Sequence, residues 1–129
     1  MADYKEYVVR VDKYKTEWFN NKGQYHREGG PAVEYSNGDR FWYKNGEYHR
    51  EDGPACEYSD GGKSWYKNGN LHREDGPARE YANGHKQWYV NGRQLTEQEF
   101  NNRNKKEFSM DEIAKALGVN VSDLKIRKD

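Results

Sequence analysis

The stretch that decides the fold is residues 46–68, GEYHREDGPACEYSDGGKSWYKN, because the chain repeats it on both sides. Residues 23–45 read GQYHREGGPAVEYSNGDRFWYKN, and residues 69–91 read GNLHREDGPAREYANGHKQWYVN. A degenerate copy of the Trp-Tyr-x-Asn end of this unit occupies residues 16–22. A fixed period of 23 residues is typical of repeat proteins, in which each unit buries its apolar surface against its neighbours.

Each unit carries two dipeptides that are typical of tight turns. Asn37-Gly38, with its equivalents Asp60-Gly61 and Asn83-Gly84, predicts a two-residue hairpin loop of type I′. Asn45-Gly46 and its equivalents turn the chain again, and a proline ends the loop that follows. The segments between the turns are rich in aromatic and β-branched residues, which favours strands. The repeats therefore predict an antiparallel meander of roughly seven or eight strands, with one hairpin in each unit.

The predicted turn also fixes which side chains share a face of the sheet. A two-residue loop at Asn37-Gly38 places Tyr35 opposite Arg40 and Val33 opposite Trp42. One face is then predicted to carry the tyrosines and tryptophans of the three units, which are Tyr35, Trp42, Tyr58, Trp65, Tyr81 and Trp88. His49 is expected beside Trp42 on that face, stacked on its ring. The other face is predicted to carry Phe41, Ser64 and Gln87.

We therefore predict a mainly β fold, a single-layer antiparallel meander of 23-residue β-hairpin repeats with short C-terminal helices as a cap. Residues 1–92 would form the array, with a capping hairpin over 5–22 and repeats at 23–45, 46–68 and 69–91. Residues 93–129 would form a helical cap, because Thr96 and Ser109 begin capping boxes and Gly118 suits a helix end. Helices are expected near 96–103 and 109–117. Two alternatives stay open for the end of the chain, a closing strand over 123–127 or a helix-turn-helix-like pair.

Composition excludes several classes of protein. Lys and Arg together number 22, as do Asp and Glu, so the formal net charge of zero argues against nucleic acid as a partner. No run approaches the roughly 18 apolar residues of a membrane span. A single cysteine, Cys56, excludes an internal disulfide and favours a reducing compartment, and no apolar region follows the first residues as in a signal peptide. Hydrophobic residues are only 33%, but 15% of the chain is aromatic, which lets thin units bury enough surface to fold.

The His-Arg-Glu-Asp segment at 49–52, with its equivalents at 26–29 and 72–75, is the strongest candidate for chemistry. Histidine beside a carboxylate can act as a general base. The segment occurs three times, however, whereas an active site needs one convergence of groups. Equivalent histidines would lie about two strand spacings apart, roughly 9–10 Å, which is too far to share one zinc ion. We therefore predict a structural corner, with Arg–Glu pairing along the array, and no catalytic residue, metal site or cofactor.

The unit Gly-x-x-His-Arg-Glu-Asp-Gly-Pro-Ala-x-Glu-Tyr-x-Asn-Gly-x-x-x-Trp-Tyr-x-Asn resembles a variant of the MORN (membrane occupation and recognition nexus) repeat over residues 16–92. It is most similar to the HREDGPA-type repeats of small bacteriophage and bacterial proteins. The resemblance implies an elongated single-layer sheet that contacts proteins or, in some members, lipids. The longer His-Arg-Glu-Asp-Gly-Pro corner departs from the standard unit and argues against lipid. The resemblance also implies a cytoplasmic location, in a bacterial cell or a phage-infected host.

These observations together predict a non-enzymatic protein-binding module, an accessory protein of a phage or bacterium. One specific form of this hypothesis is an inhibitor of a host defence protein, such as an anti-CRISPR protein. The alternatives are a structural virion or self-assembling component, and an enzyme that uses the His-Arg-Glu-Asp corners. A protein partner is expected, while its identity and the oligomeric state stay open. Aromatic residues and arginine dominate binding hot spots, so the candidate binding residues are Phe41, Trp42, Tyr48, Trp65, Arg79 and Trp88.

Two further expectations concern individual positions. Val33, Cys56 and Arg79 occupy one position of the three units and differ from each other, as Phe41, Ser64 and Gln87 do at another. Specificity for a target is expected at such positions, because packing fixes the positions that are identical. The central Trp65, with a repeat on either side, is expected to be mainly structural.

Overall fold

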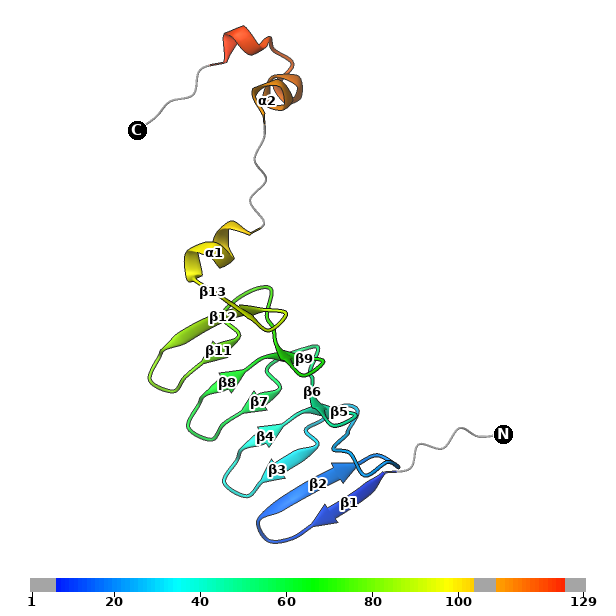
Figure 1. The fold of residues 1–129 in the computed structure, drawn as a ribbon. Coiled ribbons are helices and arrows are strands. Elements are labelled where there is room, and N and C mark those ends of the chain that lie inside the picture. The colour runs from blue at the N-terminus through cyan, green and yellow to red at the C-terminus, as the bar shows by residue number, and fades with distance from the viewer. Residues whose placement is uncertain (1–6, 104–108, 125–129) are drawn as a thin grey trace, which may run out of the picture.

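The computed structural model describes residues 7–103 and 109–124 and shows a mainly β protein (Figure 1). Its centre is a nine-stranded antiparallel sheet, accompanied by two small two-stranded sheets. Two short helices and a 3₁₀ turn follow the strands. The predicted fold class, an antiparallel array of β-hairpin repeats with short C-terminal helices, is confirmed.

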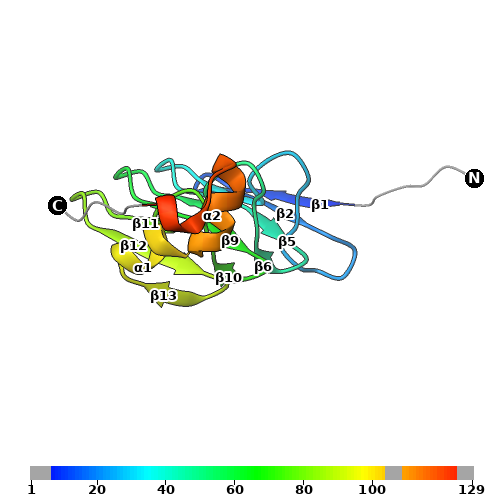
Figure 2. The same cartoon turned by 90° about the horizontal axis from the view of Figure 1, so that it is seen from above.

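The nine-stranded sheet runs the length of the array. In spatial order its strands are β1 (Val8–Val11), β2 (Lys15–Phe19), β3 (Val33–Tyr35), β4 (Arg40–Phe41), β7 (Cys56–Glu57), β8 (Lys63–Ser64), β11 (Arg79–Glu80), β12 (Lys86–Val90) and β13 (Arg93–Leu95). Seen from above in Figure 2, the turns of successive units stack in parallel along this sheet. Strands β1 and β2 form the N-terminal hairpin expected at the start of the array.

Beside the long sheet lies a second row of short hairpins. It consists of β5 (Tyr43–Lys44) paired with β6 (Glu47–Tyr48), and β9 (Tyr66–Lys67) paired with β10 (Asn70–Leu71). The first two repeats thus contribute two hairpins each, so the expected seven or eight strands become thirteen. Backbone bonds join one side hairpin to the next, since the Gly69 N–H donates to the Tyr48 carbonyl at 2.9 Å.

The two kinds of Asn-Gly turn adopt different conformations. At Asn45-Gly46 both residues have positive φ, 49° and 83°, as a two-residue type I′ turn requires. At Asn37-Gly38 only Gly38 has positive φ, 101°. The Gly38 N–H donates to the Tyr35 carbonyl at 3.0 Å, and the Tyr35 N–H donates to Asp39 at 2.9 Å. The loop therefore has three residues, and the two-residue loop predicted there is wrong.

This extra loop residue shifts the register of each long hairpin by one. Val33 pairs with Phe41, and Glu34 pairs with Arg40. A shift of one residue moves every side chain of a strand to the opposite face. Tyr35 accordingly shares a face with Phe41, with ring centroids 5.9 Å apart. The expectation that the tryptophans share the tyrosine face is wrong, because Trp42 follows Phe41 and points to the other side.

The buried interior of the array is thin and made of small side chains. Ala32, Ala55 and Ala78, one from each unit, are fully buried, and Val33 and Cys56 are nearly so. The carbonyls of Ala55 and Ala78 accept the N–H groups of Trp42 and Trp65, at 2.7 and 2.8 Å. A small residue is needed where the corner of one unit crosses the next strand this closely.

The C-terminal helices begin where the capping boxes predict. Helix α1 (Glu97–Asn102) starts after Thr96, contacts β12 and β13, and buries Phe100. Helix α2 (Met110–Leu117) starts after Ser109 and ends at Gly118, whose φ is 69°. The array reaches further than residue 92, because β13 precedes α1. None of the helices in the described ranges is long and apolar enough to cross a membrane.

The structure describes only part of the segment for which two alternatives were left open, a closing strand or a helix-turn-helix-like pair. The 3₁₀ turn η1 covers Val121–Asp123, and Leu124 is extended. Residue 123, where a closing strand was expected to begin, belongs to this turn. The rest of that expected strand, residues 125–127, lies outside the described residues.

Candidate binding groove

The repeated corners are held by an arginine that stacks on a tryptophan. The guanidinium carbon of Arg50 lies 3.8 Å from the centroid of the Trp42 ring, and that of Arg73 lies 3.9 Å from Trp65. Arg27 covers Trp18 in the same way at 4.1 Å. Cation–π contacts of this kind stabilise by about 0.5–2 kcal/mol. The group on the Trp42 ring is thus Arg50, and not His49 as predicted.

The same arginines tie each corner together through hydrogen bonds. The Nη1 group of Arg50 donates to the Pro54 carbonyl and to Glu57, both at 3.0 Å, while its Nε donates to Asp52 at 3.0 Å. Arg73 repeats this set with Pro77, Glu80 and Asp75. Arginine–glutamate pairing along the array was expected, and in the second and third units it occurs within the unit, as Arg50–Glu57 and Arg73–Glu80.

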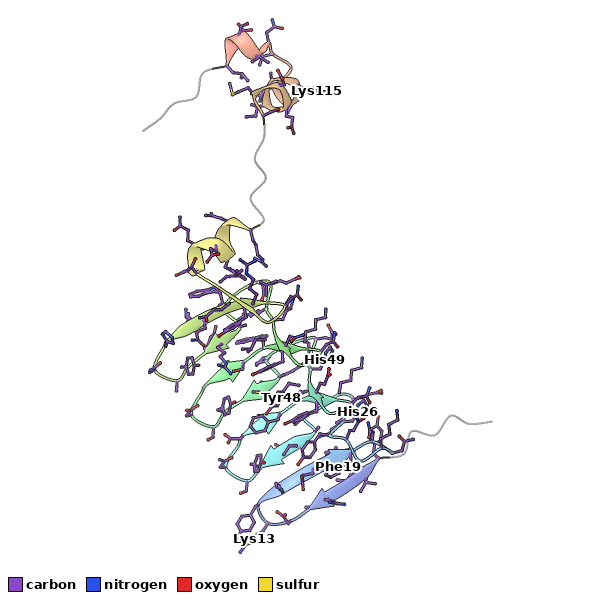
Figure 3. The ribbon with its side chains drawn as sticks, in the orientation of Figure 1. Lys13, Phe19, His26, Tyr48, His49 and Lys115 are labelled. Atoms are coloured by element: carbon purple, nitrogen blue, oxygen red, sulfur yellow. The ribbon has the colours of Figure 1, made fainter. Side chains whose placement is uncertain are left out.

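The histidines hold the turn at the end of their own unit. The Nδ1 atom of His49 accepts the Asn68 N–H at 3.0 Å, and that of His26 accepts the Asn45 N–H at 2.9 Å. The His49 Nε2 atom faces Glu51 at 2.8 Å. His26 and His49 lie at equivalent places in successive units (Figure 3). Each histidine therefore fixes the start of the type I′ turn that closes its unit, and both ring nitrogens of His49 are engaged.

Two of the positions that differ in all three units form one row on the other side of the long sheet. Each member pairs with the next across six neighbouring strands, in the order Val33, Phe41, Cys56, Ser64, Arg79 and Gln87. Because neighbouring residues of a strand point to opposite faces, this variable row lies opposite the face that carries Glu34 and Arg40. The row changes from apolar residues at its start to polar ones at its end.

The face behind the variable row is a ladder of alternating charge. Its members, in strand order, are Glu34, Arg40, Glu57, Lys63, Glu80 and Lys86. Arg40 and Glu34 are in contact at 3.2 Å. Opposite charges directly across a sheet stabilise strand pairing. The charges of this ladder are therefore balanced on their own face, away from the variable row.

Two walls of aromatic rings flank the variable row. One wall is a continuous stack on the side hairpins, with successive centroids 4.5–5.0 Å apart, through Phe19, Tyr25, Tyr43, Tyr48 and Tyr66. The other wall consists of tyrosines at the turn end of the long hairpins, exposed by 38–43%, which are Tyr35, Tyr58 and Tyr81. We call the variable row with its two walls the tyrosine groove.

The tyrosine groove has two hollows of different character. The first, about 410 Å³, lies around Phe41 and Val33 and is enclosed by Tyr35, Tyr43 and Tyr48. The second, about 280 Å³, lies between Tyr58 and Tyr81 and includes Ser64 and Arg79. The first is therefore lined mostly by aromatic residues, with Asn37 and Asp39 beside them, and the second contains a cation and a hydroxyl.

Burial in the groove shifts the titration of its acids. Burial raises the pKa of the Cys56 thiol to about 12, and it likewise raises the pKa of the Tyr58 hydroxyl to about 12. The pKa of Tyr48 is also raised, first by burial and then by its hydrogen bond with Tyr43. The Tyr25 hydroxyl donates to the Glu17 carboxylate, and this bond raises the pKa of Tyr25 to about 12. These groups are therefore neutral at physiological pH.

We expect the Cys56 thiol to resist alkylation by iodoacetamide at about pH 8 in the folded protein and to react once urea unfolds it. The unfolded thiol ionises at lower pH than the folded one, so the unfolded state binds fewer protons above roughly pH 9, and stability falls as pH rises toward 12. Urea midpoints measured across this range test the sign, with Cys56→Ser as the variant that lacks the thiol contribution. Fast alkylation of the folded protein would contradict the burial of Cys56.

The predicted binding residues fall into two groups. Phe41, Tyr48 and Arg79 all lie in the tyrosine groove, where the Phe41 and Tyr48 centroids are 6.1 Å apart. Trp42 and Trp65 lie on the opposite side, among the corner residues. Trp88 lies in β12, where it pairs with Leu95 of β13.

Several groove residues were not predicted. The wall residues Tyr25, Tyr43 and Tyr66 were missed because the side hairpins were not separated from the long strands. The arginine–tryptophan stacks were missed too, although Arg and Trp are identical in all three units. This identity was a usable signal, because a cation and a large aromatic ring that recur together can form a repeated contact.

Fold and groove together define a repeat protein built from a single-layer antiparallel sheet with an aromatic channel on one face. Comparisons with family models, with curated protein sequences and with solved structures give no match to this chain. The chemistry of the groove is therefore inferred from its own residues.

Proposed function

We propose that this chain is a non-enzymatic protein-binding module whose binding surface is the tyrosine groove. The observation that carries the proposal is that two positions which differ in all three units form one continuous row between aromatic walls, away from the identical corner residues. Arg, His, Trp and Ala, the same in each unit, hold corners and turns on one side or in the interior. The six variable residues are aligned on the other side, between two aromatic walls. In repeat proteins, scaffold residues are fixed by packing, so the remaining positions are free to recognise a target.

The chemistry of the groove suits a protein surface. Tyrosine supplies large apolar area at low conformational cost and also a hydroxyl for hydrogen bonds. Interfaces are enriched in aromatic residues and arginine, which are the side chains of this groove. Three exposed tyrosines aligned along one wall, Tyr35, Tyr58 and Tyr81, exceed the isolated apolar residues expected on a surface that meets only water.

A non-enzymatic role is supported by the contacts that the repeated histidines make. Each corner histidine accepts a backbone N–H at Nδ1 and has a glutamate within 2.8–3.9 Å of Nε2. These bonds already give histidine a structural use in every unit. The resemblance of the repeats to those of small phage and bacterial proteins supports an accessory protein of such a cell. An inhibitor of a host defence protein is the specific form of this proposal.

The experiment compares proteins captured from a bacterial lysate by the wild type and by the groove variant Phe41→Ser/Tyr48→Leu. Both replacements are residues that another unit carries at the same position, Ser64 and Leu71. Capture through the groove should fall at least about tenfold, because hot-spot residues contribute about 2 kcal/mol or more.

The matched control is Lys86→Gln, which changes an exposed residue of the charged face. This variant should capture the same proteins as the wild type, and thermal unfolding should show that all three proteins are folded. If the groove variant retains the captured proteins while Lys86→Gln loses them, the binding surface lies on the charged face and the proposal is wrong.

A further inference from the structure

Arg79 occupies an unusual place for an arginine, in the floor of the tyrosine groove and half-buried. Its Nη2 lies 3.4 Å from the Tyr66 hydroxyl, and the Tyr81 hydroxyl also faces the guanidinium. The equivalent positions of the other two units hold Val33 and Cys56, which are uncharged. The cation is therefore a property of this one place in the groove.

Three of the arginines on the opposite side are paired with a carboxylate, and Arg79 is not. Arg40, Arg50 and Arg73 have carboxylate oxygens at 3.2, 3.0 and 2.9 Å. Over residues 7–103 and 109–124, no ion pair within 4.0 Å involves Arg79. A half-buried guanidinium gains most from a charged acceptor, and a carboxylate fits its planar fork with two parallel hydrogen bonds.

The other end of the groove offers a different kind of pocket. The hollow around Phe41 and Val33 is about 410 Å³ and is enclosed by tyrosine rings. Most of its lining residues are aromatic, so it can accept an aromatic or branched aliphatic side chain that packs against their rings. Asp39, at its rim, already accepts the Ser59 N–H at 2.7 Å.

The distance between the two ends sets a spacing for the ligand. Phe41 lies on β4 and Arg79 on β11, with β7 and β8 between them, so three strand spacings separate the two residues. Three spacings of about 4.8 Å amount to roughly 14 Å. An extended peptide advances about 3.3 Å per residue, so about four residues span this distance.

We propose that the tyrosine groove binds an extended segment of the partner protein that carries an Asp or Glu on Arg79. About four residues away, the same segment places an aromatic or branched aliphatic side chain in the hollow around Phe41. This inference rests on the proposed function and adds to it the chemistry of the partner. The segment runs along the array, across the strands.

The test is selection from a displayed library of random 16-residue peptides on the full-length protein. Enriched peptides should share an acidic residue about four positions from an aromatic or aliphatic one. Arg79→Gln should weaken their binding at least about tenfold, the change expected when a charge-assisted pair is lost. Arg79→Lys keeps the charge without the planar fork and should fall between Arg79→Gln and the wild type. Lys86→Gln, on the charged face, should bind as the wild type does.

Three results would overturn the proposal, and they differ in what they imply. Peptides that lose binding to Phe41→Ser/Tyr48→Leu but bind Arg79→Gln normally would leave the groove as the binding surface and remove the carboxylate. Peptides that bind both variants normally would also count against the groove itself. A library without any binder would exclude recognition of an extended segment, while capture of a folded protein by the groove could still succeed. Thermal unfolding of Arg79→Gln verifies that the variant is folded.

Discussion

Replacing Trp65 with alanine is expected to lower the free energy of unfolding by about 3 kcal/mol, near the low end for tryptophan because its ring is half-buried. The ring is covered by the guanidinium of Arg73 at 3.9 Å. The Trp65 backbone joins its unit to the next one, because its N–H donates to the Ala78 carbonyl and its carbonyl accepts the His72 N–H. Alanine keeps these backbone bonds but removes the surface on which the corner rests. Urea unfolding followed by circular dichroism measures the change.

The matched control is Tyr81→Ala, which removes an aromatic ring that is 43% exposed and should cost less than about 1 kcal/mol. The double variant Trp65→Ala/Arg73→Ala should be more stable than the sum of the single changes predicts, by about 0.5–2 kcal/mol, because the two residues share one contact. If Trp65→Ala unfolds at the wild-type urea concentration, the ring is not part of the scaffold and Trp65 returns to the candidate binding residues.

The architecture could be predicted because it depends on features that are local in sequence. The 23-residue period, the Asn-Gly pairs and the proline of each corner determine where the chain turns. The capping boxes at Thr96 and Ser109 depend only on residues three apart, and both helices begin there. Both features can be recognised without knowing which strands pair in the sheet.

The faces of the sheet could not be predicted because two loop types share one dipeptide. A type I′ turn needs positive φ at both residues, as Asn45-Gly46 shows, whereas a three-residue loop needs it at the glycine alone, as at Gly38. Asn-Gly suits either loop. The wrong choice shifts the register by one residue and exchanges the faces, which is why Trp42 was placed beside Tyr35.

Only part of the candidate site could be predicted, because some of its residues depend on contacts between units. Phe41, Tyr48 and Arg79 were chosen because they are exposed or variable, and this criterion does not depend on the register. The wall formed by Tyr25, Tyr43 and Tyr66 depends on contacts between side hairpins of different units. Such contacts link residues about 20 positions apart and have no local sequence signal.

The second large effect concerns binding, and it is expected in the variant Phe41→Ser/Arg79→Val. Each replacement is the residue of another unit at the same position, Ser64 and Val33, so the sheet should accept both. The variant loses the aromatic floor at one end of the tyrosine groove and the cation at the other. Two hot-spot residues, each about 2 kcal/mol, correspond to a loss of affinity of at least about a hundredfold, allowing for incomplete additivity.

The most direct measurement is a calorimetric titration of one groove-selected peptide into this variant and into Trp65→Ala, at a temperature where circular dichroism shows both to be folded. The variable groove residues are proposed to bind, and the identical corner residues to support the fold. Trp65→Ala should therefore bind the peptide with wild-type affinity despite its lower stability, and Phe41→Ser/Arg79→Val should show no measurable binding despite being folded. The opposite result, lost binding in folded Trp65→Ala and wild-type affinity in Phe41→Ser/Arg79→Val, would contradict this division.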